Sequence, residues 1–314
     1  MSEPAASETS GSKKRAKVIL HNGEMMSPAV MRLRQALLIS PGMLTIILLL
    51  ALPGLSLFVV SFLSRGDYGE LVMTFTTDNF KRLAGYGFFG WSADNLLIIW
   101  RSIVIAFFTT LICILLSYPL AFFLASRPQK TRIVWLTLLL VPFWTNLVIR
   151  TYAWLLALAP EMPLAKILSL LGIIDADTPL YPGTFAVYVG MVSTFLPFVA
   201  LPLYTAVEKL DWSLVEAAQD LYANPLRVFR TAILPQTMPG LSVGVTLTFV
   251  PTMGMFVVPD MLGGSRTMLI GNLIQQQFGT SRDWPFGAAI SLVLMILTLS
   301  ALMASRRNQN FGTH

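Results

Sequence analysis

Residues 216–225 read Glu-Ala-Ala-Gln-Asp-Leu-Tyr-Ala-Asn-Pro, and residues 232–235 follow with Ala-Ile-Leu-Pro. This charged, helix-forming stretch lies between two strongly apolar blocks of the chain. An apolar chain has little reason to carry a polar amphipathic segment in its middle unless something outside the apolar environment binds it. We therefore expect a partner at this stretch.

The composition of the whole chain is that of a membrane protein. Of 314 residues, 55% are hydrophobic and 12% are charged, and the mean hydropathy is +0.68, whereas soluble domains carry about 25% charged residues. A net charge of +6 and a pI near 9.6 can also indicate nucleic-acid binding. The basic residues, however, fall mainly between apolar blocks, as membrane topology requires. We predict contact with a lipid bilayer and no nucleic-acid partner.

Six apolar blocks are long enough to cross a bilayer, which takes about 20 residues. They are 36–63, 95–125, 133–158, 185–207, 238–260 and 286–305. The polar residues 1–34 predict a disordered cytoplasmic tail, residues 35–307 a transmembrane domain, and residues 308–314 a second cytoplasmic tail. The predicted fold is an all-α membrane protein with six transmembrane helices.

The distribution of Lys and Arg predicts the orientation of these spans. With the N-terminus inside, 14 of the 22 basic residues fall in inside segments and eight fall outside. Both termini are therefore expected in the cytoplasm. The segment 211–235, between the fourth and fifth spans, is expected there too.

The segment 211–235 predicts two short helices. Asn224-Pro225 ends the first, and the second begins with Leu226. Glu216 and Asp220 lie one turn apart on a face separate from the apolar stripe. The N-cap candidates are Asp211, Trp212 and Ser213, and the predicted apolar stripe is Leu214, Ala217, Ala218 and Leu221. On composition alone, a helix lying on the inner leaflet fits as well as a docking element.

The same segment resembles the EAA loop of ABC-importer permeases, in which Glu-Ala-Ala precedes a glycine by three residues and an Ile-x-Leu-Pro by nine more. This chain has Glu216-Ala217-Ala218 and, at the matching distance, Leu234-Pro235, with Tyr222 and Ala232 at the glycine and isoleucine positions. A glycine there permits a positive φ at little cost, so a tyrosine must bear that cost or adopt another conformation. In the family this helix couples the permease to a cytoplasmic ATPase. The resemblance implies ATPase-coupling roles for Glu216, Ala217, Ala218, Asp220, Leu221, Tyr222 and Pro225.

Further stretches extend the resemblance over most of the chain after residue 40. They are Val-Pro-Phe-Trp-Thr-Asn at 141–146, Leu-Pro-Phe at 196–198, Met-Leu-Gly-Gly at 261–264 and Arg-Asp-Trp-Pro-Phe-Gly-Ala-Ala at 282–289. They are similar to the spermidine/putrescine importer permeases, most of all to the PotB-type subunit. The resemblance implies a type I ABC importer permease (MetI-like) fold in the bacterial inner membrane. It implies as partners a second, PotC-like permease, a PotA-like ATPase dimer and a periplasmic, PotD-like polyamine-binding protein.

The sequence shows no motif for catalysis by the chain itself. It lacks the Gly-rich phosphate loop followed by Lys-Ser/Thr, so the resemblance leaves ATP and Mg²⁺ to the partner ATPase. Its two histidines, His21 and His314, lie near the chain ends, and Cys113 is the one cysteine. We predict no catalytic residue, no metal site and no cofactor bound by this chain.

A path for polyamines needs acidic or carbonyl oxygens, and aromatic faces for cation–π contact with ammonium groups. No Asp or Glu lies at the centre of a predicted span; Asp260 and Asp283 belong to the outer ends of the fifth and sixth. Pro-Thr-Met-Gly at 251–254 interrupts the fifth, and irregular backbone at depth is tolerated where it lines a cavity. The pathway candidates are Trp144, Asn146, Tyr152, Tyr188, Thr252, Met253, Phe256, Asp260, Asp283 and Trp284. Interfacial anchoring or helix packing explains the aromatic members equally well.

Two other functions stay open at this point. The same permease class can carry another small solute, such as iron, thiosulfate or sulfate. A secondary transporter or channel would need no ATPase, but it predicts midplane charges or inverted repeats, and neither is visible in the sequence. An intramembrane enzyme has no nucleophile–base pair to support it.

Overall fold

The structure, a computed structural model, describes residues 28–66, 68–87, 90–170, 180–264 and 267–310. Most of it is helical, with two short antiparallel strand pairs, β1–β2 and β3–β4. In chain order the elements are α1 (Pro28–Ser61), β1 (Ser64–Arg65), β2 (Leu71–Val72), α2 (Asp78–Leu83), β3 (Tyr86–Gly87), β4 (Gly90–Trp91), α3 (Asp94–Ala125), α4 (Gln129–Leu140), the 3₁₀ helix η1 (Val141–Trp144), α5 (Leu147–Ala157), α6 (Pro163–Leu170), α7 (Thr184–Glu208), α8 (Trp212–Asp220), α9 (Pro225–Val228), the π-helix η2 (Phe229–Ile233), α10 (Leu234–Gly254), α11 (Val257–Leu262), α12 (Ile270–Phe278) and α13 (Trp284–Asn310). The chain divides into two units, Met1–Ser56 and Leu57–His314.

The first unit contains most of α1. Its apolar part, Leu37–Ser61, matches the first predicted span, and its most apolar 18-residue window has no buried residue. The helix begins at Pro28, so residues 28–34, which the sequence assigns to the polar tail, are helical. The rest of that predicted tail, residues 1–27, and residues 311–314 lie outside the described part of the chain.

Five helices of the described chain are long and apolar enough to cross a membrane, or six if one bent pair counts as a single span. Three predicted blocks have nearly the bounds of observed helices. They are 95–125, which matches α3, 185–207, which matches α7, and 286–305, which matches the apolar part of α13, Trp284–Met303. The fifth block, predicted at 238–260, starts too late and ends too late. The corresponding helical run is Pro225–Gly254, because α9, η2 and α10 follow one another without a break.

The third predicted span, 133–158, is instead two helical segments bent by 95°. Pro142 has no N–H to continue the helix ladder, and Asn146 starts a new helix by accepting a hydrogen bond from the Val148 N–H (2.8 Å). The Pro142 carbonyl accepts hydrogen bonds from the Thr145 N–H (3.4 Å), Thr145 Oγ1 (2.6 Å) and Arg150 Nη1 (2.9 Å). The bend is therefore a stabilised feature, which makes the pair a broken span or a re-entrant loop.

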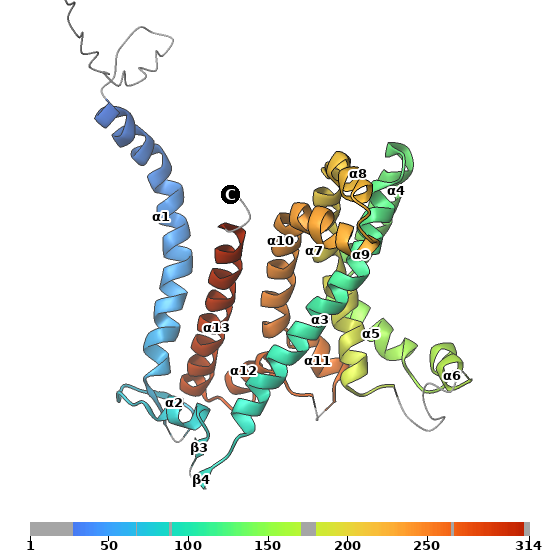
Figure 1. Cartoon of the computed structure of the whole chain (residues 1–314). Helices are drawn as coiled ribbons and strands as arrows, with labels where there is room; N and C mark the ends of the chain where they lie inside the picture. Colours follow the sequence, from blue (N-terminus) through green and yellow to red (C-terminus); the bar gives the residue numbers. More distant parts are fainter. Residues whose placement is uncertain (1–27, 67, 88–89, 171–179, 265–266, 311–314) are drawn as a thin grey trace, which may run out of the picture. The chain divides into compact units, whose positions relative to one another are not determined.

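Helices α3, α7 and α10 pack against one another to form the centre of the second unit (Figure 1). Two glycines of α10 bring it close to α7. A Cβ added to Gly240 would lie 2.5 Å from the Pro202 carbonyl oxygen, and one added to Gly244 would lie 3.0 Å from Val199 Cα. Small residues four apart allow this close backbone approach between membrane helices.

The fifth span is interrupted at Met255 and Phe256, directly after the predicted residues 251–254, which are still helical. Helix α10 ends at Gly254, Met255 is extended, and α11 starts at Val257. Asn272 of α12 donates a hydrogen bond from Nδ2 to the Phe256 carbonyl (2.9 Å), which satisfies the backbone at the break. Gly271 lies so close that its Cβ would be 2.5 Å from the Gly254 carbonyl oxygen. The helix α12 thus supports the break directly.

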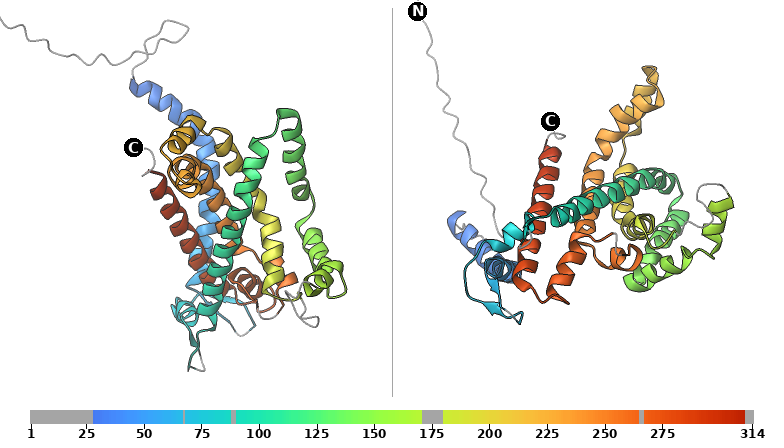
Figure 2. Two further views of the ribbon diagram at one scale, coloured as in Figure 1. Left: turned by 45° about the vertical axis from the view of Figure 1, so that its right-hand side comes forward. Right: turned by 90° about the horizontal axis from the view of Figure 1, so that it is seen from below.

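The two ends of the second unit differ in structure. Helices α8 and α9 lie at one end of α10, and α11 and α12 lie at the other end (Figure 1 and Figure 2). At the opposite end, α2, α12 and the start of α13 pack together. Each end therefore presents a different candidate surface.

Candidate functional site

The 211–235 segment forms a helix–turn–helix tied to the start of α10. Asp211 caps α8, with its Oδ1 accepting hydrogen bonds from the Ser213 N–H (3.0 Å) and the Ser213 hydroxyl (2.7 Å). The Asp211 N–H donates to Gln236 Oε1 (2.9 Å), and Gln236 Nε2 donates to the Ala232 carbonyl (2.9 Å). Of the three predicted N-cap candidates, Asp211 has this role.

Tyr222 makes the turn between the two helices in the left-handed conformation, with a φ of +56°. Its N–H donates to the Gln219 carbonyl (2.9 Å), and the Ala223 N–H donates to the Ala218 carbonyl (3.3 Å). The tyrosine ring is 99% exposed and so gains no packing in return. Tyr222 therefore adopts the glycine-like geometry and bears its cost, which answers the question that the sequence left open.

A small apolar core holds α8 and α9 together. Val215, Val228 and Ala232 are buried in it, and Ala218 and Ala223 pack at its edge. The predicted apolar stripe is mostly wrong: Leu214, Ala217 and Leu221 are exposed, and Ala218 alone packs against the core. The buried face is centred one residue further along the helix, at Val215.

The outward surface of this segment combines acidic and apolar side chains. Glu216 and Asp220 are exposed on α8, and their neighbours include several exposed large apolar residues, namely Trp212, Leu214, Leu221, Tyr222 and Leu226. Ala217 and Pro225 are exposed as well. An exposed patch of this kind is typical of a protein contact.

One arginine at this end, Arg132, joins α4 to α7 and to the end of α3. Arg132 of α4 forms an ion pair with Glu208 and donates a hydrogen bond to the Tyr204 hydroxyl (3.3 Å), both on α7. It also donates from Nη2 to the Arg127 carbonyl (3.2 Å), beyond the end of α3. The side chains of Arg132, Glu208 and Trp212 line a cavity of about 560 Å³. Only the tertiary fold brings them together.

Replacing Tyr222 with glycine is expected to raise the free energy of unfolding by about 1 kcal/mol, because a left-handed non-glycine residue costs roughly 1–2 kcal/mol and glycine recovers part of that. The exposed ring contributes no packing that would be lost. Thermal unfolding of the purified protein measures the change. Tyr222→Ala is the matched control and should leave the melting temperature unchanged, since it keeps the Cβ; a glycine variant less stable than the alanine variant contradicts the strain at this turn.

The predicted pathway residues come from three groups of elements. Trp144, Asn146 and Tyr152 lie on the bent pair and are exposed. Around the end of α10, Thr252 and Met253 are buried, while Phe256 and Asp260 are exposed; Tyr188 of α7 is half-buried against the core. Helix α11 packs on both α5 and α7, so the first two groups lie on neighbouring elements.

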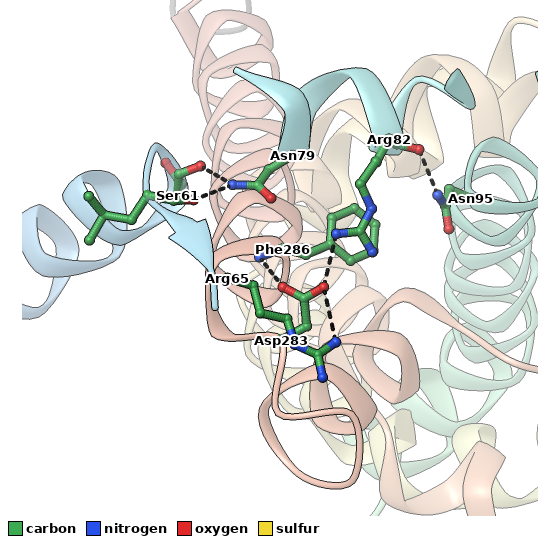
Figure 3. Close-up of polar contacts among 8 residues, drawn as sticks. Ser61, Arg65, Asn79, Arg82, Asn95, Asp283 and Phe286 are labelled. Atoms are coloured by element: carbon green, nitrogen blue, oxygen red, sulfur yellow. Dashed lines mark hydrogen bonds and ion pairs between the residues drawn. The ribbon is translucent and has the colours of Figure 1, made fainter. Parts of the chain in front are cut away.

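The third group is Asp283 and Trp284, at the boundary where α13 begins. The contacts of Asp283 indicate a role in stabilising the fold. Asp283 is 2% exposed and pairs with Arg82 of α2 (2.9 Å) and Arg65 (3.9 Å). Its Oδ1 also accepts a hydrogen bond from the Phe286 N–H (3.2 Å), and the Arg82 guanidinium lies 4.3 Å from the Phe286 ring centre (Figure 3). This carboxylate is already neutralised by arginines, so the pathway role predicted for Asp283 is not supported by its contacts. Its neighbour Trp284 is exposed and contacts Phe278 edge-on.

No group of three or more His, Cys, Asp or Glu side chains that could hold a metal ion is found among the residues that the structure describes. The cysteine Cys113 is buried between α3 and α7, where its thiol lies 3.9 Å from the Val192 carbonyl. Among the predicted site residues, the carboxylates that stay exposed are Glu216 and Asp220 of α8 and Asp260 of α11.

Comparison with known proteins finds permease relatives that match most of the chain. Residues 117–307 match the model of the family described as binding-protein-dependent transport system inner membrane component. The spermidine/putrescine transport system permease protein PotB of Escherichia coli is 43% identical over 252 residues, covering 80% of this chain and 89% of that protein. PotB of Haemophilus influenzae is 39% identical over the same share of the chain and covers 86% of that protein.

Solved structures support the fold. A chain of a bacterial alginate ABC transporter superposes with a TM-score of 0.68 at 15% identity, covering 91% of this chain and 99% of that chain. A chain of the MetNI methionine ABC transporter superposes with a TM-score of 0.51 at 16% identity, covering 70% and 96% respectively. The MetI-like permease fold expected from the sequence is thus confirmed. The protein described here belongs to the family of inner-membrane components of binding-protein-dependent transport systems, as a PotB-like, multi-pass member.

Proposed function

We propose that this chain is the transmembrane permease subunit of an ATP-driven importer of polyamines, and that α8 couples it to the ATPase. The observation that carries the coupling role is the geometry of α8 to α10. An exposed acidic and apolar helix is fastened through Asp211 and Gln236 to a helical run of 30 residues, Pro225–Gly254. A push on α8 therefore moves a long helix at the centre of the fold.

The polyamine cargo rests on the relatives. PotB proteins of several bacteria are named as spermidine/putrescine permeases, and they match 80% of this chain. By this reasoning the partners are a PotC-like second permease, two PotA-like ATPase subunits that use ATP and Mg²⁺, and a PotD-like binding protein. The Lys and Arg bias supports placing α8 in the cytoplasm and the α11–α12 end outside.

The proposed mechanism is alternating access. Closure of the ATPase dimer moves α8, and the spans reorient from inward-facing to outward-facing while the binding protein releases its polyamine. Within this scheme the exposed Trp144, Asn146, Tyr152 and Phe256 are the candidates for weak contacts along the path. Weak contacts suit transit, because a tightly held cargo leaves slowly.

Glu216→Arg is expected to lower ATP-dependent spermidine uptake at least tenfold in proteoliposomes of the full complex. Reversing a charge in a protein interface places like charges together or strips a partner of its counter-ion. Uptake and ATP hydrolysis are measured in parallel, with Glu161→Arg as the control, an exposed acid at a distant loop. Normal uptake and normal ATPase stimulation in Glu216→Arg remove the coupling assignment.

The cargo is tested separately from the coupling. One relative, ModB of Azotobacter vinelandii, is named as a molybdenum permease and is 28% identical over 229 residues, so the family spans unlike solutes. Excess unlabelled spermidine and putrescine should suppress uptake by the reconstituted complex, whereas molybdate and sulfate should not. Uptake that ignores both polyamines removes them as cargo and leaves the permease class intact.

A further inference from the structure

Arg132 uses all three nitrogens of its guanidinium group to join three helices. Its Nη1 forms the ion pair with Glu208 and donates a hydrogen bond to the Tyr204 hydroxyl (3.3 Å), both on α7. Its Nε and Nη2 donate to the Arg127 carbonyl (3.3 and 3.2 Å), and Nη2 donates a longer bond to the Ala125 carbonyl (3.5 Å). The side chain thereby satisfies carbonyls that the end of α3 leaves without helix partners, and it ties them to α7.

This contact gives α4 a directional connection to α7. The Arg132 side chain is 23% exposed and that of Glu208 is 42% exposed. An exposed ion pair on its own contributes little, but an arginine held by several acceptors at once keeps one geometry. The apolar contacts of α4 nearby, through Leu136 and Leu139, depend on the hydrophobic effect, which is non-directional. The ion pair therefore sets how α4 is oriented on α7.

The ion pair also lies between the proposed coupling helix and the bent pair. Glu208 is the last residue of α7, and α8 begins four residues later at Trp212. Arg132 is near the start of α4, which leads through η1 to the bend at Asn146. A displacement of α8 therefore reaches the bend by a second route, besides the connection to α10 through Gln236.

The cavity of about 560 Å³ beside the ion pair leaves room for such a displacement. Phe122 and Phe123 of α3 line it together with Arg132, Glu208 and Trp212. The Trp212 side chain is 52% exposed, so the first turn of α8 is not packed tightly against α3 and α4. Because close-packed surfaces resist relative movement, this open space allows α8 to shift while the ion pair stays closed.

We propose that Arg132 and Glu208 form a positioning clamp, which makes α4 follow α7 when the ATPase moves α8. The clamp transmits that movement to the bent pair and its candidate pathway residues. The inference rests on the proposed function and adds a second route of coupling to it. Neither residue contacts the cargo in this scheme. Loss of the clamp leaves the ATPase bound at α8 but lets ATP be hydrolysed without the matching movement of the bent pair.

The test measures spermidine uptake and ATP hydrolysis in parallel in proteoliposomes of the complete complex, and the readout is the amount of spermidine imported per ATP. Glu208→Ala should lower this ratio about fivefold, the lower end of typical coupling between sites, while ATP hydrolysis continues. Glu208→Gln keeps an oxygen that can accept from Arg132, so its ratio should lie between those of Glu208→Ala and the wild type.

The pair itself is tested by a double-variant cycle. Arg132→Gln should lower the ratio as Glu208→Ala does, and the variant with both changes should lose no more than either single variant, because both remove the same interaction. If Arg132→Gln does not fold, since it leaves the α3 carbonyls unpaired, the two Glu208 variants decide the question alone.

Lys130→Gln is the matched control, because it removes an exposed cation from the same helix, two residues before Arg132; its ratio should equal that of the wild type. A Glu208→Ala complex that assembles and imports with the wild-type ratio overturns the clamp while the proposed function stands. Additive losses in the double variant overturn the clamp too, and so does a proportional fall of uptake and ATP hydrolysis, which indicates a role in assembly alone. A wild-type complex in which ATP hydrolysis drives no spermidine uptake overturns the proposed function together with the clamp.

Discussion

Replacing Arg82 with methionine is expected to destabilise the protein by about 3 kcal/mol, the lower end of the range for removing one partner of a buried ion pair, because Arg82 itself is 44% exposed. The variant leaves the Asp283 carboxylate 2% exposed, with Arg65 at 3.9 Å as its remaining cation. It also removes the guanidinium that lies over the Phe286 ring. The change is measured as the shift in denaturant or thermal unfolding of the purified protein in detergent.

Asp283→Asn should cost less, about 1.5–3 kcal/mol, the value of a hydrogen bond to a charged group. The two arginines are 44% and 42% exposed, so water can solvate them when the carboxylate is gone. Asparagine also keeps an oxygen that can accept from the Phe286 N–H. The double variant Arg82→Met/Asp283→Asn should therefore be more stable than the sum of the two single changes predicts, by up to about 3 kcal/mol.

Lys81→Met supplies the control for this cycle. Lys81 neighbours Arg82, and its ion pair with Asp78 (2.9 Å) is exposed on both sides, so its loss should change stability by less than about 1 kcal/mol. If Lys81→Met and Arg82→Met lower the stability equally, Asp283 is not part of a buried ion pair. The same follows if the double variant loses as much stability as Arg82→Met and Asp283→Asn lose together.

The long spans and the helix–turn–helix were predictable because their signals are local. Length and composition are enough to predict a span such as α3. The cap at Asp211 is also local, because its carboxylate accepts a hydrogen bond from the N–H of Ser213, two residues later. The family resemblance indicated a turn at Tyr222, whereas the helix end predicted at Asn224-Pro225 came too late: α8 ends at Asp220, and Asn224 caps the second helix instead. Only the conformation that a tyrosine adopts there needed the structure.

An error on α8 and an unforeseen bend show where local signals stop. The stripe on α8 was centred on Leu214 although Val215 is the buried residue. Adjacent helix positions lie 100° apart, and periodicity alone does not say which of two apolar faces meets a partner. Residues 133–158 were predicted as one span, and the pair can still be one span that is broken at its 95° bend. The cap signal at Asn146, which starts the second helix, was not used.

The environment of Asp283 depended on tertiary structure alone. Its main partner, Arg82, lies 201 residues earlier in the chain, and no sequence spacing relates the two. A carboxylate at the predicted mouth of a cation pathway looked functional for that reason. By contrast, Asp260 keeps an exposed carboxylate, so the structure separates two acids that the sequence treated alike.

Replacing Gly240 with valine is expected to destabilise the protein by about 3 kcal/mol, at the upper end of the range for overpacking. The first added carbon would already lie 2.5 Å from the Pro202 carbonyl oxygen and 2.6 Å from Ala206 Cβ, and one of these contacts is with backbone. Helices α7 and α10 must therefore separate at their crossing. Thermal unfolding and the yield of folded protein measure the loss, and Gly244→Val should act in the same direction through Val199.

Gly254→Ala is the control for these glycine variants, because a Cβ at that position would meet only Leu294 Cδ2 at 3.8 Å. An alanine in the helix is favoured over glycine by about 1 kcal/mol, so this variant should be as stable as the wild type or more stable. If Gly240→Val also unfolds at the wild-type temperature, the close packing of α7 on α10 is wrong. If it folds but no longer links ATP hydrolysis to uptake, the crossing transmits motion from α8 along α10, since the helix run that begins at Pro225 reaches the crossing before the break at Gly254.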